Sequence, residues 1–319
     1  MCSEDAVLQS GEVAVVWRSV VVSSPAKLRR EHFSLVVEQE QAARVPFEDI
    51  AIIVLNHREI TLTHPVLSAC GEYGIGLFST GDDHQPNGVF MPFLQHSRAT
   101  RMLRLQLGLD RPKTKRAWAE IVQRKIANQA ACLRLAGRGS TERLESLGRR
   151  VRSGDAGNME AQAAALYFSK LMGRGFDREQ ESWTNAALNY GYAVIRGAIA
   201  RGLVAHGMLP SIGLFHASEQ NAFNLADDLI EPFRPLVDLH VVTQMRQRRM
   251  DASDLLPADK VGLVGLLNVD VRMPQGEMTV LAAIEYSTES LLRLYEGDEP
   301  HALALPGLIG LGQHVGDGG

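Results

Sequence analysis

The sequence SIGLFHASEQNAFNLADDLIEPFRPLVD, residues 211–238, gathers a histidine and several carboxylates among apolar side chains. Apolar residues recur in it at helical spacing, which predicts a buried or half-buried helix rather than a solvated acidic loop. Its polar residues of interest are His216, Asp227, Asp228 and Glu231. Carboxylates buried side by side repel one another, and a bound cation would offset that repulsion. The stretch therefore predicts a cation site around which the rest of the chain is built.

The spacing within this stretch allows more than one role for each carboxylate. Asp228 and Glu231 are three residues apart, so on a helix their Cβ atoms lie roughly 5–6 Å from each other and both could reach one divalent ion. Pro232 disfavours helical geometry at Glu231, which places that glutamate at a helix end or a break. Simpler roles stay open, because Asp227 and Asp228 suit the first turn of a helix and Glu231 could pair with Arg234.

Length and composition indicate a globular protein of two domains. Of its 319 residues 45% are hydrophobic, and no apolar run reaches the roughly 18 residues of a membrane-spanning helix. The first residues, MCSEDAVLQS, lack the basic and apolar regions of a secretory signal, so we expect a cytoplasmic protein with no membrane partner. Three cysteines without C-x-x-C spacing argue against a disulfide framework or a thiolate zinc site.

Charge is distributed unevenly along the chain. Residues 1–97 hold 6 Lys and Arg against 12 Asp and Glu, residues 98–152 hold 15 against 4, and residues 153–319 hold 12 against 21. The basic middle block is typical of a surface that binds the phosphate backbone of a nucleic acid. A solvated helical surface would have the same composition, so both interpretations stay open.

The order of predicted elements indicates an α+β protein with a small N-terminal β domain and a larger all-helical domain, which the resemblance described below implies is the catalytic domain. Short β-branched runs dominate the first hundred residues, and from residue 97 the composition changes to Ala, Leu, Arg and Gln. We expect a β domain at 1–93, a linker at 94–100, a helical metal- and DNA-binding domain at 101–300 and a flexible tail at 301–319. The strands offer an apolar face beyond what a small sheet needs, so the β domain is assigned to dimerisation.

Basic residues at helical spacing are the candidate DNA contacts. Arg98, Arg101 and Arg104 recur every three residues and line one face of a predicted helix. A second amphipathic helix, over 118–133, and a cluster after it in the chain supply the others. These further candidates are Arg124, Lys125, Arg246, Arg248 and Arg249.

Another helix is expected to begin near Asn158, a suitable N-cap, and to end at Gly173. Glu160 then falls in its first turn, where the helix dipole favours a carboxylate, so its position alone assigns it no function. The last nineteen residues contain one charge and six glycines, and this weak patterning is the reason for expecting a flexible tail.

Five motifs follow one another along the chain: WRSVVVSSPAKL at 17–28, HPVLSACGEYGIGLFSTGDDHQPNG at 64–88, NMEAQAAALYF at 158–168, LNYGYAVIRGAIARGLVAHG at 188–207 and GLFHASEQNAFNLADDLIEPFRPLVD at 213–238. With these motifs the chain resembles the CRISPR adaptation integrase, the spacer-acquiring endonuclease that is the first of the numbered Cas proteins, and most closely its type II subfamily. The resemblance implies a homodimer whose helical domain holds Mg²⁺ or Mn²⁺. The family's metal-binding positions map to Glu160, His216 and Glu231, and Asp228 falls where many relatives keep a further acidic residue.

The resemblance also implies a reaction and a set of partners. The 3′-hydroxyls of a short DNA duplex, the prespacer, would attack phosphodiesters at the boundaries of a CRISPR repeat by transesterification. A small ferredoxin-like companion Cas dimer would bridge two dimers of this protein, and the type II guide-RNA effector nuclease would join them when DNA is chosen.

Two other functions remain compatible with the residues themselves. One is a noncatalytic DNA-binding scaffold of a defence complex, in which the acidic cluster is merely structural. The other is a metal-dependent phosphoesterase for small substrates. The basic block argues against the phosphoesterase, because a small substrate does not require so many cations.

Overall fold

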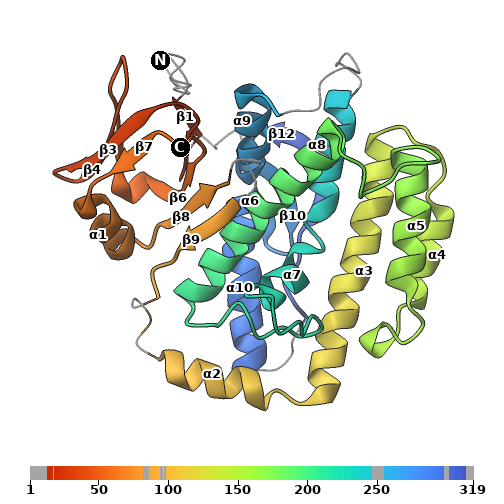
Figure 1. Cartoon of the computed structure of the whole chain (residues 1–319). Coiled ribbons are helices and arrows are strands. Elements are labelled where there is room, and N and C mark those ends of the chain that lie inside the picture. Colours follow the sequence, from red (N-terminus) through yellow and green to blue (C-terminus); the bar gives the residue numbers. More distant parts are fainter. Residues whose placement is uncertain are drawn as a thin grey trace.

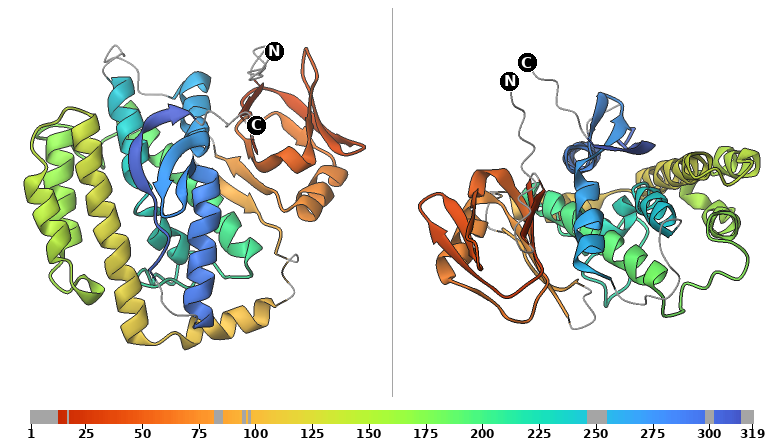
Figure 2. Two further views of the ribbon diagram at one scale, coloured as in Figure 1. Left: turned by 180° about the vertical axis from the view of Figure 1, so that it is seen from behind. Right: turned by 90° about the horizontal axis from the view of Figure 1, so that it is seen from above.

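The computed structural model describes residues 13–16, 18–81, 86–93, 96, 98–245, 255–297 and 302–313. Strands dominate the first ninety residues and helices the remainder, which confirms the expected mixture of α and β structure. Figure 1 shows the N-terminal strands at one side and the long helices α3 (Arg111–Leu135) and α6 (Trp183–Ala205) in the rest of the molecule. Seen from above in Figure 2, α6 lies between the strands and α3.

The N-terminal strands form two sheets. The order β1-β2-β6-β8-β9 joins β1 (Val13–Val16), β2 (Arg18–Val22), β6 (Ile50–Leu55), β8 (Gly76–Thr80) and β9 (Pro86–Phe90). The order β5-β4-β3-β7 joins β5 (Ala43–Pro46), β4 (Ser34–Glu38), β3 (Ala26–Glu31) and β7 (Ile60–Leu62), with α1 (His64–Tyr73) packed beside them. Strand β6 lies between two parallel neighbours and reads IAIIVL, an unbroken apolar run typical of a parallel strand covered on both faces.

The two faces of the five-stranded sheet enter two different cores. Val20 and Val22 pack against the second sheet and α1, whereas Val21 and Phe78 pack into the core of the helical region. Successive residues of a strand point to opposite faces, so one sheet serves both cores. Phe78 lies so close to α6 that a Cβ atom at Gly197 would come within 2.6 Å of its ring. The apolar face that the sequence analysis assigned to a dimer partner is therefore covered by the chain's own helices.

The region after residue 98 is mostly helical but not all-helical, which corrects the sequence-based fold class. Besides α3 and α6 it contains α2 (Ala99–Gly108), α4 (Glu142–Arg150), α5 (Met159–Leu171), α7 (Asn224–Ile230), α8 (Arg234–Met245), α9 (Pro257–Gly265) and α10 (Val280–Glu296). A three-stranded antiparallel sheet, in the order β11-β10-β12, consists of β10 (Val269–Met273), β11 (Gly276–Thr279) and β12 (Gly307–Gln313). Within the described residues, no helix combines the length and apolarity that crossing a membrane requires.

The expectation of a flexible tail from residue 301 is wrong for the part of the tail that is described. Strand β12 pairs with β10, and its backbone at Leu308 donates a hydrogen bond of 3.1 Å to Asn128 Oδ1 of α3. The Nδ2 of Asn128, a buried residue, donates in turn to the carbonyl oxygens of Pro232 and Pro306 at 2.6 and 2.8 Å. One amide of α3 therefore joins the C-terminal strand to the turn that follows α7.

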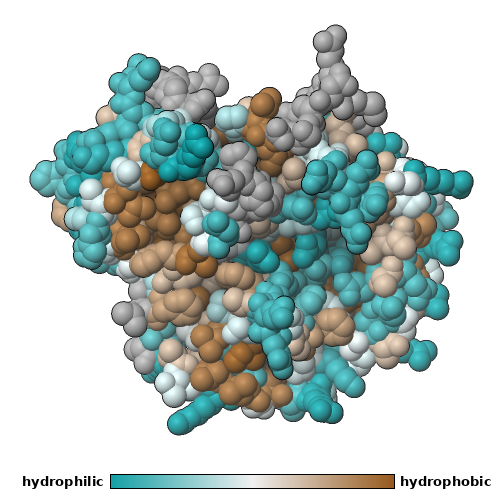
Figure 3. Space-filling view, in the orientation of Figure 1, coloured by the Kyte–Doolittle hydropathy of each residue, from teal (hydrophilic) through white to brown (hydrophobic). Residues whose placement is uncertain are grey.

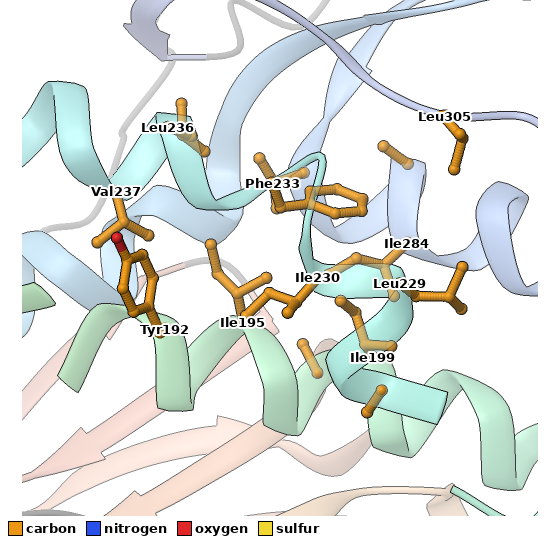
Figure 4. Packing of buried hydrophobic residues seen from close by; sticks show 14 of the residues in the cluster. Tyr192, Ile195, Ile199, Leu229, Ile230, Phe233, Leu236, Val237, Ile284 and Leu305 are labelled. Carbon is orange, nitrogen blue, oxygen red and sulfur yellow. The ribbon is translucent and has the colours of Figure 1, made fainter. Parts of the chain in front are cut away.

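Helix α7 is short and is held by apolar packing on its neighbours. Figure 4 shows Leu229 and Ile230 among Ile195 and Ile199 of α6 and Ile284 of α10. All five side chains are almost completely buried. This packing fixes α7 and the turn that follows it against the long helix α6.

Candidate metal-binding and catalytic site

Two glutamates from different helices share one ammonium group. The Nζ of Lys125, on α3, lies 2.6 Å from Glu160 Oε1 at the start of α5, and it also forms an ion pair with Glu231 Oε2 in the turn between α7 and α8. Glu231 Oε1 accepts a hydrogen bond of 2.9 Å from Arg234 Nε. Two of the three predicted ligands therefore face a common cation, and the simpler pairing of Glu231 with Arg234 is also present.

Lys125, Glu231 and Arg234 keep their charges despite their burial. Burial alone would raise the pKa of Glu231, which is 5% exposed, but Arg234 and Lys125 outweigh it and hold that pKa below its ordinary value. Burial likewise acts to lower the pKa of Lys125, and Glu231 and Glu160 outweigh it and raise that pKa. Removal of one partner would leave an uncompensated buried charge, which is strongly destabilising.

Glu160 is positioned by the residues just before α5. The Oδ1 of Asp155 accepts a hydrogen bond of 2.9 Å from Met159 N, and its Oδ2 accepts one of 3.0 Å from Glu160 N. The expected capping residue, Asn158, has a left-handed backbone (φ 50°), and its side chain makes no capping hydrogen bond. Asp155 therefore replaces it as the capping side chain, and a capped first turn fixes Glu160 beside Lys125.

Only the last part of the 211–238 stretch is helical, in contrast to the predicted single helix. The chain before α7 is a loop that contains His216, and α7 ends at Ile230 so that Glu231 lies at the break predicted from Pro232. The loop is stabilised by the buried side chain of Asn224. Its Nδ2 donates to two loop carbonyls and its Oδ1 accepts from one loop amide, which satisfies backbone groups that a helix would otherwise pair.

Asp228 holds the loop and the imidazole of His216 together. Its fully buried carboxylate accepts hydrogen bonds from the backbone N–H groups of Leu214, Phe215 and His216 at 2.5, 3.1 and 3.1 Å. Its Oδ1 also lies 2.7 Å from His216 Nδ1, and this hydrogen bond raises the pKa of His216 although partial burial opposes it. The turn requires Gly213, since a Cβ there would lie 2.3 Å from the carbonyl oxygen of His216.

Helix α3 places His216 near the two glutamates. Phe215 stacks on Trp118 of α3 with ring centroids 4.3 Å apart, and His216 meets the Trp118 ring edge-on at 5.8 Å. Trp118 and Lys125 are seven residues apart, about two helical turns, so they lie on the same face of α3. The three predicted ligands therefore gather along one face of one helix.

The donor set suits a divalent ion, but the described residues do not enclose one. Among them, no three His, Cys, Asp or Glu side chains meet closely enough to surround a metal. The ammonium of Lys125 lies between Glu160, which is partly buried, and Glu231, which is buried, and supplies the positive charge that this pair of carboxylates needs. With the ammonium withdrawn, these glutamates and the imidazole of His216 are suitable ligands for Mg²⁺ or Mn²⁺.

Asp227 and Asp228 do not join the two glutamates at their shared cation. Asp227 Oδ2 accepts a hydrogen bond of 2.7 Å from Asn221 Nδ2, and its Oδ1 lies 3.8 Å from the guanidinium of Arg196. Both aspartates therefore serve the loop that carries His216. Asp228, predicted as a catalytic candidate, is in this geometry a positioning residue that acts through the imidazole.

The arginine row lies on the exposed face of α2, as the spacing predicts. Arg98, Arg101 and Arg104 are exposed, while Met102 on the opposite face is buried. Arg101 forms an ion pair of 3.2 Å with Glu296 at the end of α10. Arg98 and Arg104 form no ion pair with any other described residue, so two of the three guanidinium groups are available to a phosphate backbone.

The remaining DNA candidates differ in their surroundings. Arg124 is exposed and lines a hollow of about 430 Å³ together with Arg134 and Arg272. Lys125, its neighbour, points to the two glutamates and not to the open surface. The candidates Arg246, Arg248 and Arg249 lie outside the described residues.

Several residues of this site carry no strong signal in the sequence. The carboxylate of Asp238 on α8 accepts a hydrogen bond of 2.8 Å from Tyr167 Oη and another from Tyr192 Oη. Burial raises its pKa to about 6, although both tyrosines act to lower it. Asp238 lies seven residues after Glu231, so helical spacing could have indicated it. The tyrosines, Trp118 and Asp155 meet the site only through the tertiary fold.

Comparison with known proteins places this geometry in a family. The family described as CRISPR associated protein Cas1 matches residues 20–272 of the chain. The chain belongs to the Cas1 family. It is 41% identical over 302 residues to the CRISPR-associated endonuclease Cas1 of Neisseria meningitidis serogroup C (strain 8013), which covers 94% of this chain and 99% of the relative. The resemblance inferred from the five motifs is thereby confirmed.

Solved structures share the Cas1 fold at low sequence identity. A casposase bound to integration product superposes with a TM-score of 0.75 at 16% identity, covering 90% of this chain and 93% of the casposase. A Cas1 protein from Thermotoga maritima has a TM-score of 0.67 at 16% identity and covers 89% and 99% of the two chains. The Cas1 fold therefore extends over nearly the whole chain.

Proposed function

We propose that this Cas1 protein is a metal-dependent integrase of CRISPR adaptation that joins the 3′-hydroxyl ends of short duplex DNA to a CRISPR repeat. Membership of a family of CRISPR-associated endonucleases supports nuclease or integrase chemistry. The observation that carries the proposal is that Glu231, which is buried, and Glu160, which is partly buried, share the ammonium of Lys125 on α3, the helix against whose Trp118 the ring of His216 packs.

The reaction exchanges one phosphodiester for another. A 3′-oxygen of the prespacer loses its proton and bonds to a phosphorus atom of the repeat. The bond from that phosphorus to the repeat's own 3′-oxygen breaks, and the released oxygen takes up a proton. No water is consumed, and water in place of the 3′-hydroxyl would give endonuclease cleavage instead.

Each residue of the site has a definite part in this reaction. Glu160, His216 and Glu231 would hold Mg²⁺ or Mn²⁺, which when bound supplies stabilisation of the charge on the phosphoryl and leaving oxygens. Arg234 keeps Glu231 ionised, as the lowered pKa of that glutamate indicates. Asp228 holds Nδ1 of His216, so the other ring nitrogen faces away from this carboxylate and is available as a ligand.

The partners are part of the same proposal. Inserting a duplex between two repeats takes two strand transfers, which requires two copies of this site and favours a homodimer. The exposed Phe33 and Phe93 and the hydrophobic residues over the N-terminal strands in Figure 3 are suitable contacts for a second copy. A chain of a Cas6-RT-Cas1–Cas2 complex shares the fold with a TM-score of 0.70 over 94% of this chain and 37% of that chain, which supports Cas2 as the small companion protein. If the chain is a type II Cas1, the guide-RNA effector nuclease would be a further partner when DNA is chosen.

Strand transfer on labelled DNA tests the proposal. The wild-type protein should join a labelled duplex to a repeat-containing plasmid with Mg²⁺ or Mn²⁺ and not with a chelator. Glu160→Gln and Glu231→Gln should each abolish joining, while Arg174→Gln, a change at an exposed loop residue, should not. Glu160→Gln should still bind duplex DNA. Binding without joining under every metal condition would favour the noncatalytic scaffold.

Light scattering tests the dimer separately from the chemistry. The subunit mass is 35.0 kDa, so a homodimer should give about twice that value. A monomer at micromolar concentration that still joins DNA would contradict the dimer and leave the assignment of the site intact.

A further inference from the structure

A small pocket adjoins the Glu231 side of the candidate site. It encloses about 210 Å³ and is lined by residues of α3, α6, α8 and the segment between α5 and α6. Its charged lining consists of three cations, Lys125, Arg178 and Arg234, and two carboxylates, Glu231 and Asp238. The pocket is smaller than the roughly 300–1,000 Å³ of most small-molecule sites, so it suits one chemical group better than a whole ligand.

Arg178 is held in this pocket by neutral groups. Its Nη1 donates a hydrogen bond of 2.8 Å to Asn185 Oδ1, and its Nη2 donates one of 2.7 Å to Asn189 Oδ1. The guanidinium also lies 5.7 Å from the centroid of the Tyr192 ring. Asn185 cannot turn away easily, because its Nδ2 donates to the carbonyl oxygens of Asp177 and Gln180.

Arg178 differs from the other two cations of the pocket because it forms no ion pair with a described carboxylate. Lys125 and Arg234 both form ion pairs with Glu231. In the described part of the chain, no carboxylate lies within ion-pair distance of Arg178, whose two amide partners are neutral, and the nearby Asp238 acts on it only through longer-range electrostatics. A guanidinium has five N–H donors, so three remain after the two amide hydrogen bonds. Arg178 is therefore a preorganised cation with spare donors beside the reacting site.

We infer that Arg178 binds a backbone phosphate of the DNA strand, next to the phosphate that reacts between Glu160 and Glu231. Guanidinium groups with a fixed orientation suit phosphate oxygens, which accept two parallel N–H donors. The pocket then fixes the position of the strand relative to the site. This inference rests on the proposed function, since it takes DNA as the substrate and deepens the description of the same site.

Metal-free DNA binding is the first test, because it does not depend on chemistry. Arg178→Gln should weaken binding of the prespacer duplex by about tenfold and lower the slope of log affinity against log salt by about one. Arg174→Gln makes the same charge change at an exposed residue of the same segment and should leave both values unchanged. If Arg178→Gln does not fold, Arg178→Lys keeps the charge and should still lose part of the affinity, because an ammonium cannot form the two parallel contacts.

Neutral methylphosphonate linkages, placed one at a time in the labelled strand, locate the phosphate. At one linkage near the reacting end, the difference in affinity between wild type and Arg178→Gln should disappear, and at all other linkages it should persist. A constant difference at every linkage would overturn the inference. The inference would also be overturned if the affinity difference between wild type and Arg178→Gln disappeared when a base was removed and not when a phosphate was neutralised. The pocket would then bind a nucleobase.

The two levels of the proposal can fail separately. If the wild-type protein joins no DNA, the proposed function fails, while the metal-free binding measurements still decide the role of Arg178. If the wild-type protein joins DNA and Arg178→Gln has the same KM and affinity as Arg174→Gln, only the inference about Arg178 fails.

Discussion

Asp228 Oδ1 accepts a hydrogen bond of 2.7 Å from Nδ1 of His216, while the same carboxylate accepts three backbone N–H groups of the loop that carries this histidine. Both oxygens of this carboxylate already act as acceptors toward backbone N–H groups, and with Oδ1 as the acceptor Nδ1 carries the proton. In the neutral imidazole the other ring nitrogen then has the free lone pair that a metal ligand requires. One buried side chain therefore sets both the position and the tautomer of His216.

We expect Asp228→Asn to abolish strand transfer as completely as His216→Ala, because an amide cannot accept all four hydrogen bonds. Loss of charged hydrogen bonds at a buried position should also lower the free energy of unfolding by at least about 2 kcal/mol. Asp227→Asn is the matched control, since Asp227 contacts Asn221 and not the imidazole. Strand transfer and thermal unfolding measure the two effects. Normal transfer by Asp228→Asn would show that the position of His216 does not depend on this carboxylate.

Lys125→Met should make folding depend on a divalent ion. Without metal the variant removes the ammonium from Glu160 and leaves Glu231 with Arg234 as its remaining described partner, a loss of about 3–5 kcal/mol for a broken, largely buried pair. Added Mn²⁺ can then bind without competing with the ammonium, so the rise in melting temperature should be larger than in wild type. Arg124→Met, at the exposed neighbouring position, should respond to Mn²⁺ as wild type does. Equal shifts in all three proteins would mean that the ion does not bind at the position of the ammonium.

Asp238 should make stability fall as the pH rises between about 4 and 6. Its pKa is about 6 in the folded protein against 3.8 ordinarily, so the folded state holds more protons across that interval. The contribution of protonated Asp238 to the free energy of unfolding is complete below pH 3.8 and is lost as the pH rises through about 6. The shift corresponds to a loss of roughly 3 kcal/mol. Urea unfolding of wild type and Asp238→Asn over this interval isolates the effect. A difference between the two proteins that does not change with pH would contradict it.

The basic face of α2 should bind duplex DNA without reading its sequence. Arg98→Glu and Arg104→Glu should weaken binding to all duplexes alike and lower the salt slope by about one for each phosphate that the variant no longer binds. Arg101→Glu should differ, because it also breaks the ion pair with Glu296 and brings two carboxylates together. Fluorescence anisotropy at several salt concentrations measures the slope. Unchanged slopes would mean that this face of α2 is a solvated surface that does not bind DNA.

The sequence predicted those parts of the site whose signals are local. Pro232 predicted the helix break at Glu231, and the three-residue repeat predicted the exposed arginine face of α2. The five motifs supplied Glu160, His216 and Glu231, which composition and spacing alone could not bring together. Their roles as metal ligands remain predictions.

The parts that the sequence did not predict depend on distant contacts. The place of Lys125 between two glutamates requires α3, α5 and α7 to be packed together, and no spacing within α3 indicates it. Strand β12 has little pattern of its own and forms because β10 supplies its hydrogen-bonding partner. The apolar spacing of the 211–238 stretch predicted a helix, but residues 211–223 form a loop in which the side chains of Asn224 and Asp228 pair backbone groups.

The side-chain amide of Asn128 links the candidate site to residues near the end of the described chain, which are synthesised late. It holds the carbonyl of Pro232, beside Glu231, and completes its own hydrogen bonds with Pro306 and Leu308, which leave the ribosome long after the site residues. A late stop codon would therefore spare every predicted ligand and DNA contact and still deprive Asn128 of these two partners. The turn beside Glu231 therefore gains its full support from α3 only after residues 306–308 have been synthesised.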